Sequence, residues 1–113
     1  MSKARIERVA GAAVLFAALG DPTRMALLQR LSSGGPSSIS VLAEDFSMTR
    51  QGVTKHLNVL ADAKIIDGER QGRERIWTLN LSRLAEAQRS LELIARGWDD
   101  ALSRLKAHVE RDG

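Results

Sequence analysis

The most informative stretch of this chain is residues 41–79, VLAEDFSMTRQGVTKHLNVLADAKIIDGERQGRERIWTL. Its apolar spacing predicts a short helix, a turn, and a second helix that begins after a cap at Thr49 and ends near Ala63. Two short β-prone runs follow, at 65–66 and 76–79, on either side of a charged tip that contains glycine. This order is typical of a winged helix-turn-helix, in which one helix enters the DNA major groove and the hairpin lies beside it.

Another helix is predicted before this stretch. Asp21 is a preferred N-cap, and Pro22 suits the first helical position because its missing N–H leaves no hydrogen bond unmade. This helix is expected to end in the loop SSGGPSS at 32–38, and Ser40 is expected to cap the short helix that follows. The inward faces of the helix after Pro22 and of the helix after Thr49 are predicted to contain Met25, Leu27, Leu28, Leu31, Val53, Leu57, Val59 and Leu60.

The two ends of the chain are predicted to be helices that pair with a second copy. The segment 5–19 is apolar around most of its circumference, which requires partners on more than one side. Ser82 is expected to cap a final helix that reaches about Val109 and has apolar residues every three or four positions. In a small protein these surfaces favour a second subunit. The predicted dimer interface consists of Ile6, Val9, Ala13, Phe16, Leu91, Ile94, Trp98, Leu102 and Leu105.

The predicted fold class is therefore mainly α with a small β-hairpin, a single winged helix-turn-helix domain with five helices over residues 1–113. The dimerisation helices are assigned to 1–19 and 82–110, the helix-turn-helix to 40–63 and the wing hairpin to 65–80. A chain of this length buries one core, and Trp77 in the second hairpin strand is expected to belong to it.

Composition restricts the classes of function. The net charge is +3 and the isoelectric point is near 10.0, which favours polyanionic partners. The chain has no cysteine, which excludes disulfides and all thiolate chemistry. It also has no matched nucleophile and base, no phosphate loop and no dinucleotide fingerprint, so we predict neither an enzyme nor a bound cofactor.

The N-terminal segment has a basic end followed by an apolar run, so a signal peptide is the alternative to a helix here. Glu7 and Arg8 lie inside the segment, and no convincing cleavage site follows them. No run in the chain approaches the roughly 18 apolar residues of a membrane span. We therefore expect a cytoplasmic protein without a membrane partner.

The helix after Thr49 exposes side chains suited to reading double-stranded DNA. Arginine can form two hydrogen bonds with guanine, glutamine can do so with adenine, and threonine can contact a thymine methyl group or a phosphate. Lys55 and His56 are better suited to phosphates, and the arginines around Gly72 suit a narrow, negative minor groove. The predicted DNA-binding residues are Thr49, Arg50, Gln51, Thr54, Lys55, His56, Asn58, Arg70, Arg73 and Arg75.

These assignments have alternatives. A polar helix face is often only solvated, and Glu69 and Glu74 are consistent with a mixed-charge turn that serves solubility. Trp98 is expected to anchor an interface or the core rather than to form a ligand platform. A metal site between two copies of His108 is disfavoured, because one histidine per helix supplies too few ligands for zinc. We therefore predict no metal.

The chain resembles the ArsR-type family of small bacterial winged-helix repressors over about residues 10–80, and its final helix is similar in kind. The motifs that carry the resemblance are ALGDPTRMALLQRL at 18–31, VLAEDFSMTRQGVTKHLNVLADAKII at 41–66 and GERQGRERIWTL at 68–79. The resemblance implies a homodimer that meets an inverted-repeat operator and releases or retains it according to a signal. It also implies that the polar residues from Thr49 to His56 lie on the reading helix and the three arginines on the wing.

The chain departs from the metal sensors of this family. Sensors of arsenic, cadmium or lead use cysteines, often in the third helix, where this chain has VLAEDF. Sensors of zinc or nickel commonly pair two positions rich in His and Asp on the last helix, where this chain has only His108. The alternatives for the signal are an organic ligand, a protein, expression level alone, or none. A pocket among Leu91, Ile94, Trp98 and Phe16 would favour an apolar effector, and a packed seam a constitutive dimer. We predict a sequence-specific DNA-binding repressor, with a protein-interaction module as the alternative.

Overall fold

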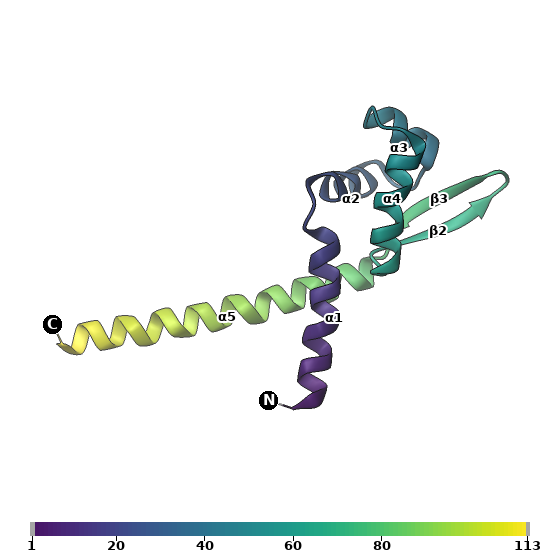
Figure 1. The fold of residues 1–113 in the computed structure, drawn as a ribbon. Coiled ribbons are helices and arrows are strands. Elements are labelled where there is room, and N and C mark those ends of the chain that lie inside the picture. The colour runs from purple at the N-terminus through teal and green to yellow at the C-terminus, as the bar shows by residue number, and fades with distance from the viewer. Residues whose placement is uncertain (1, 113) are drawn as a thin grey trace.

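A computed structural model describes residues 2–112 and confirms the predicted fold class (Figure 1). Within this range the chain forms five helices and a three-stranded antiparallel sheet. The elements are α1 (Lys3–Leu19), α2 (Pro22–Gly34), β1 (Ser37–Ser38), α3 (Ile39–Asp45), α4 (Arg50–Asp62), β2 (Ile66–Gln71), β3 (Glu74–Leu79) and α5 (Leu81–Asp112). Helices α3 and α4 form the helix-turn-helix, and β2 and β3 form the wing.

Two of the four expected helix caps are confirmed. The carboxylate of Asp21 accepts a hydrogen bond from the backbone N–H of Arg24 at 3.0 Å, at the start of α2. The hydroxyl of Thr49 accepts one from the N–H of Gly52, also at 3.0 Å, at the start of α4. Each cap satisfies an N–H that has no acceptor inside its own helix.

The other two expected caps are wrong, each by two residues. Ser38 rather than Ser40 caps α3, because Ser38 has the extended backbone that an N-cap requires and its hydroxyl accepts from the N–H of Val41. Asn80 rather than Ser82 stands before α5, where its side-chain oxygen accepts from the N–H of Arg83 at 3.3 Å. In both places the helix follows closely after a strand, β1 or β3, and begins earlier than the sequence pattern indicated.

The sheet extends beyond the predicted hairpin. The segment 37–38, expected as loop, is a short strand that pairs with β3, so the strand order is β1-β3-β2. The wing strands also continue further into the charged tip than predicted, and leave a tight turn in which Gly72 has a φ of 64°. A side chain would strain the backbone there.

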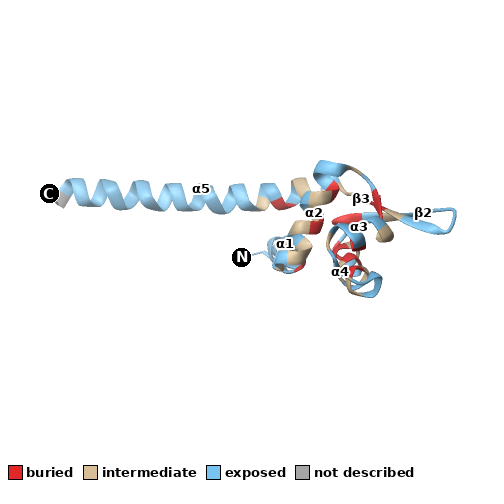
Figure 2. Cartoon of the chain, turned by 90° about the horizontal axis from the view of Figure 1, so that it is seen from above, coloured by how far each residue is buried: buried red, intermediate tan, exposed pale blue. Residues whose placement is uncertain are grey.

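The core lies between α1, α2, α3, α4 and the base of the sheet, where buried residues gather in Figure 2. Trp77 is buried, as predicted. Met25 and Val59 were expected to face inward and are instead 50% and 40% exposed. Each lies two residues from a buried leucine, Leu27 or Leu57, which places it about 200° around the helix from that leucine.

Helix α5 gives the molecule its extended shape. Its first turns pack on the body through Leu84 and Ala87, and the rest projects past α1 with every described side chain exposed (Figures 1 and 2). The molecule measures 68 × 32 × 20 Å with a radius of gyration of 19.1 Å. A compact domain of similar length has a radius of gyration of about 13 Å, so half of α5 lies outside the body.

Helices α1 and α2 meet at a bend of 92°. Arg24 spans this corner: its Nε donates to the carbonyl of Ala18 at 2.6 Å and a terminal nitrogen donates to that of Ala17 at 3.4 Å. The carbonyl of Ala17 also accepts from the N–H of Gly20 at 3.2 Å, so Arg24 adds a second donor there and supplies one to Ala18 at the end of α1. By length and composition alone, α1 and α2 together could form a bent membrane span. No single helix within residues 2–112 is long and apolar enough to do so.

The cap at this corner predicts a pH dependence. The hydrogen bond from the N–H of Arg24 lowers the pKa of Asp21, against a smaller opposing effect of burial and with help from the charges of Arg24 and His56. The pKa of Asp21 in the folded chain therefore lies below its value of about 3.9 in the unfolded chain. The charged cap stabilises the fold fully at pH values above the unfolded pKa, and this contribution is lost as the pH falls through the folded pKa.

We therefore expect the chain to lose part of its stability between neutral and acidic pH through Asp21. Asp21→Asn is the matched control, because asparagine also caps helices but does not titrate. Urea unfolding of both proteins at pH 7 and pH 3 should show the wild-type advantage shrinking at the lower pH. An equal loss in both proteins would mean that other groups account for the acid sensitivity.

Candidate nucleic-acid interface

Helix α4 presents a polar stripe to solvent, formed by Gln51, Thr54, Lys55 and Asn58. The spacing of three, four and seven residues places these side chains on one face, opposite the buried Val53, Leu57 and Leu60. Gln51, Lys55 and Asn58 are exposed, and none of their side chains makes a hydrogen bond or ion pair with another residue in the range 2–112. This face of α4 is available to a partner.

The two threonines of α4 have their hydroxyls engaged within the helix. Thr49 serves as the cap, and Oγ1 of Thr54 donates to the carbonyl of Arg50 at 2.6 Å. The methyl group of Thr54 remains on the polar stripe. A contact of Thr54 with DNA would therefore be apolar.

His56 is separate from the polar stripe. Its Nδ1 lies 3.8 Å from a carboxylate oxygen of Asp21 and 3.5 Å from a terminal nitrogen of Arg24, and its side chain is 25% exposed. One residue along a helix is a rotation of about 100°, which carries His56 from the face of Lys55 toward the core. Here it joins α4 to the α1–α2 corner. The sequence pattern indicated only a capping role for Asp21 and no role for Arg24, so this contact was not predicted.

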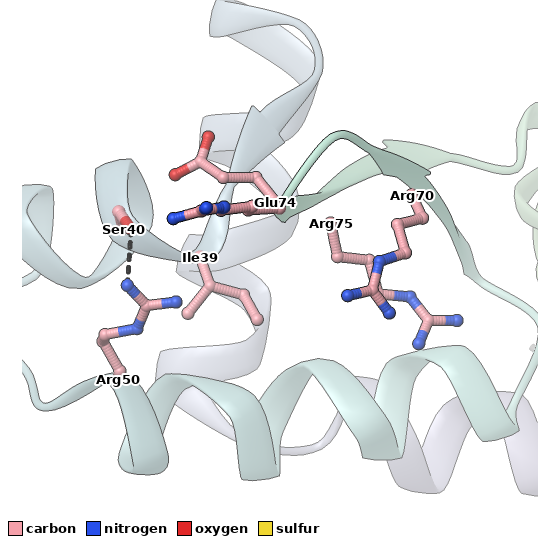
Figure 3. A pocket seen from close by; sticks show the side chains of 7 residues that line it. Ile39, Ser40, Arg50, Arg70, Glu74 and Arg75 are labelled. Carbon is pink, nitrogen blue, oxygen red and sulfur yellow. Dashed lines mark hydrogen bonds between the residues drawn. The ribbon is translucent and has the colours of Figure 1, made fainter.

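Four of the candidate arginines meet around a single hollow. Arg50 from the start of α4 and Arg70, Arg73 and Arg75 from the wing line a space of about 220 Å³, together with Ile39, Ser40 and Glu74. Figure 3 shows Arg50 donating a hydrogen bond to Ser40, which is 2.8 Å long, while Arg70 and Arg75 extend from the wing. We call this site the arginine hollow. Its chemistry suits an anion such as phosphate, which arginine binds through charged hydrogen bonds.

The strand register separates the charges of the wing. Arg70 lies directly opposite Arg75, while Gln71 lies opposite Glu74 and Glu69 opposite Ile76. Because directly opposite residues share a face and successive residues alternate, Arg70 and Arg75 are on one face and both glutamates are on the other. Glu74 nevertheless lines the arginine hollow, so the hollow contains one carboxylate among four arginines. Two like charges opposite each other destabilise a hairpin, so the pair is better explained by an anionic partner.

Trp77 supports Arg75. The guanidinium carbon of Arg75 lies 5.1 Å from the centre of the Trp77 ring, a cation–π distance. Gly68 lies opposite Trp77, and a Cβ there would be 2.5 Å from Nε of Arg75 and 2.9 Å from a ring carbon of Trp77. The absent side chain at Gly68 therefore allows Arg75 to lie across the ring. Trp77 was predictable as core from the sequence, whereas the role of Gly68 was not.

The residues expected at a subunit interface are largely exposed along α1 and α5. A groove of about 970 Å³ lies between these helices and includes Val9, Ala13, Phe16, Ala87 and Ile94 in its lining. It does not include Leu91, although Ser90 and Leu93 on either side line it, or Trp98, which lies further along α5. Within residues 2–112, no three His, Cys, Asp or Glu side chains lie close enough to hold a metal ion.

Known proteins that are similar to this chain are helix-turn-helix transcriptional regulators. The family described as helix-turn-helix domain matches residues 19–69. The HTH-type transcriptional regulator Rv2034 of Mycobacterium tuberculosis is 32% identical over 96 residues, which cover 85% of this chain and 86% of that protein. The transcriptional repressor SdpR of Bacillus subtilis is 32% identical over 87 residues, covering 76% of this chain and 96% of SdpR.

A solved structure supports the same assignment. An ArsR-like transcriptional regulator from Rhodococcus sp. RHA1 superposes with a TM-score of 0.76 at 35% identity, covering 87% of this chain and 92% of that one. The similarity extends over the helix-turn-helix and the wing, which hold the polar stripe and the arginine hollow. The chain belongs to the ArsR-type family of winged helix-turn-helix transcriptional regulators, whose members are not enzymes.

Proposed function

We propose that this protein is a repressor that binds an inverted-repeat operator in double-stranded DNA as a homodimer. The observation that carries the proposal is the position of Arg50, which belongs both to α4, next to Gln51, and to the arginine hollow. The polar stripe and the wing arginines thereby form one continuous basic surface. A surface that combines a polar helix face with a cluster of arginines fits a nucleic acid better than a protein partner.

The polar stripe is proposed to enter the major groove. Gln51 is suited to adenine through its amide, the Thr54 methyl group to a thymine methyl, and Lys55 and Asn58 to the neighbouring base edges or phosphates. His56 is left out of this set because it lies against Asp21 and Arg24. Its proposed role is to hold α4 at the α1–α2 corner.

The arginine hollow is proposed to contact the DNA backbone beside the major groove. Arg50 was expected from the sequence to read guanine, but its hydrogen bond to Ser40 directs it toward α3. We therefore assign it to phosphate, with Arg70, Arg73 and Arg75 reaching phosphates and the adjacent minor groove. Thr49 is proposed to act through its helix N-terminus, which favours a phosphate.

The dimer is proposed to form through α1 and α5. Ile6, Val9, Trp98 and the apolar residues around it are exposed in the single chain, which is costly over so long a helix. A two-fold axis between two copies would present the α4 helices to half-sites about one helical turn apart, or a multiple of that distance. We propose that the protein acts in the cytoplasm, where its operator is.

The test is selection of genome fragments by the purified protein at two salt concentrations. An inverted repeat recovered at low salt and lost as salt rises would support the proposal, because bound phosphates release counterions. Binding without sequence preference would contradict the operator, and no binding at either concentration would favour a protein-interaction module.

Single substitutions in α4 separate base reading from backbone contact. Gln51→Ala is expected to cost about 1–3 kcal/mol of operator binding and to relax discrimination at one base pair. Arg50→Ala is expected to weaken binding to all sequences uniformly and to reduce the salt slope by about 1 for each subunit. Titrations against a set of single-base operator variants distinguish the two patterns. Uniform weakening by Gln51→Ala would assign Gln51 to phosphate instead.

A further inference from the structure

The outer part of α5 has an apolar seam that is not covered in the single chain. Leu91, Ile94, Trp98, Leu102, Leu105 and Val109 recur every three or four residues, and each is 54–66% exposed. Residues at this spacing lie on one side of a helix. An isolated helix with this much exposed apolar surface requires a cover.

The spacing of the seam is symmetric about Trp98. Ile94 and Leu102 lie 4 residues from Trp98 on either side, Leu91 and Leu105 lie 7 residues away, and Ala87 and Val109 lie 11 residues away. An antiparallel copy of α5 that is centred on Trp98 would therefore place an apolar residue opposite each of these positions. An axis between residues 94 and 95 would instead place Val109 opposite Asn80, outside the helix.

We propose that two copies of α5 pair antiparallel about a two-fold axis at Trp98, so that Ile94 of one copy meets Leu102 of the other and Leu91 meets Leu105. The inference rests on the homodimer of the proposed function and specifies its register. A two-fold contact of this kind is self-complementary, since each pair of residues occurs twice.

The α1–α5 groove fits the second copy in this register. Ile94 belongs both to the seam and to the wall of the groove, across from Val9 and Phe16 of α1, and Ala87, which packs on the body, lines the same wall. The C-terminal part of the second α5 runs along this wall and brings its Leu102 and Val109 to the groove. The groove is thereby part of the dimer interface rather than a pocket for an apolar effector.

Charge placement also favours the antiparallel pairing. Glu92 and Lys106 are exposed and 14 residues apart, close to four helical turns, so both lie on the same flank of the seam. Centred on Trp98, the pairing brings Glu92 to within about 3 Å along the axis of Lys106 in the second copy. A parallel pairing in register would leave Glu92 and Lys106 of the two copies about 21 Å apart along the axis, so they would not meet.

Cysteine pairing tests the register directly, because the natural chain has no cysteine. The variants Ile94→Cys and Leu102→Cys are made separately and are then mixed and mildly oxidised. A disulfide-linked dimer is expected in the mixture and not in either variant alone. In each variant alone the two cysteines are about 12 Å apart along the axis, beyond the Cα separation of about 7 Å that a disulfide spans. Ser103→Cys, on the other side of the helix, replaces Leu102→Cys in the control mixture.

A second measurement uses the unsubstituted protein. Zero-length carbodiimide coupling is expected to join Glu92 to Lys106, and mass spectrometry identifies the joined peptides. Within one helix these residues are about 21 Å apart, so the bond must form between two copies.

The outcomes separate this inference from the proposed function. A dimer by sedimentation that binds the operator but gives neither link, or that links Ile94→Cys to itself, would overturn the register and leave the repressor standing. A monomer by sedimentation would overturn both the register and the proposed homodimer. The substituted side chains are exposed in the single chain, so the fold of each subunit does not depend on them.

Discussion

Replacing Arg70 and Arg75 together with alanine is expected to reduce operator affinity by on the order of 10³-fold at about 0.15 M salt, because four phosphate contacts are lost from the dimer. Both arginines line the hollow, and Trp77 holds Arg75 in place for a backbone contact. The slope of the logarithm of the binding constant against the logarithm of salt concentration should fall by about 3.6. Titrations at four or more salt concentrations measure both quantities.

The same double variant should not lose stability. Arg70 and Arg75 are directly opposite each other, so removing their charges relieves a repulsion in the wing. The lost contact between Arg75 and Trp77 opposes this gain, so the urea midpoint should change little. Arg96→Ala with Arg104→Ala, on the exposed part of α5, removes the same net charge away from the hollow. An equal loss of affinity in this control would show that net charge rather than a wing contact explains the effect.

Trp98→Asp is expected to convert the dimer to monomers and to reduce affinity for the complete operator by on the order of 10²–10⁴-fold. The substitution places a charge at the centre of the proposed seam, where pairing would remove it from water. The loss follows because two linked subunits bind both half-sites, whereas a monomer binds one. Sedimentation gives the assembly state, and titration with complete and half operators gives the two affinities.

Ser103→Asp is the matched control for this variant. Ser103 is five residues from Trp98 and about 140° around the helix from it, and both side chains are exposed in the single chain. The control should remain dimeric and bind the complete operator normally. A Trp98→Asp protein that stayed dimeric would show that the interface does not include Trp98. Affinity for a half operator should be equal in all three proteins, since α4 and the wing are untouched.

Much of the fold was predictable because helix formation depends on nearby residues. Asp21 and Thr49 cap their helices as expected, since an N-cap bond joins residues only three apart. Apolar spacing located all five helices and the seam of α5. The caps at Ser38 and Asn80 were mispredicted because the backbone there follows strands β1 and β3, whose positions depend on pairing between residues about 40 apart.

The candidate site was predictable in its residue types but not in its arrangement. Residue type and position predicted Arg50, Arg70, Arg73 and Arg75, but their meeting around one hollow depends on how the wing packs beside α3 and α4. The opposition of Arg70 and Arg75 likewise depends on strand register, since a shift of one residue would move them to opposite faces.

The position of His56 was also not predictable from its residue type. By residue type it belonged with Lys55 as a phosphate contact, and packing placed it beside Asp21 and Arg24 instead. Local sequence accounts for where helices run and which faces are apolar, because both follow from the geometry of a single helix. Contacts between distant segments account for which polar side chains share a surface, because strand register and helix packing minimise the energy of the whole chain.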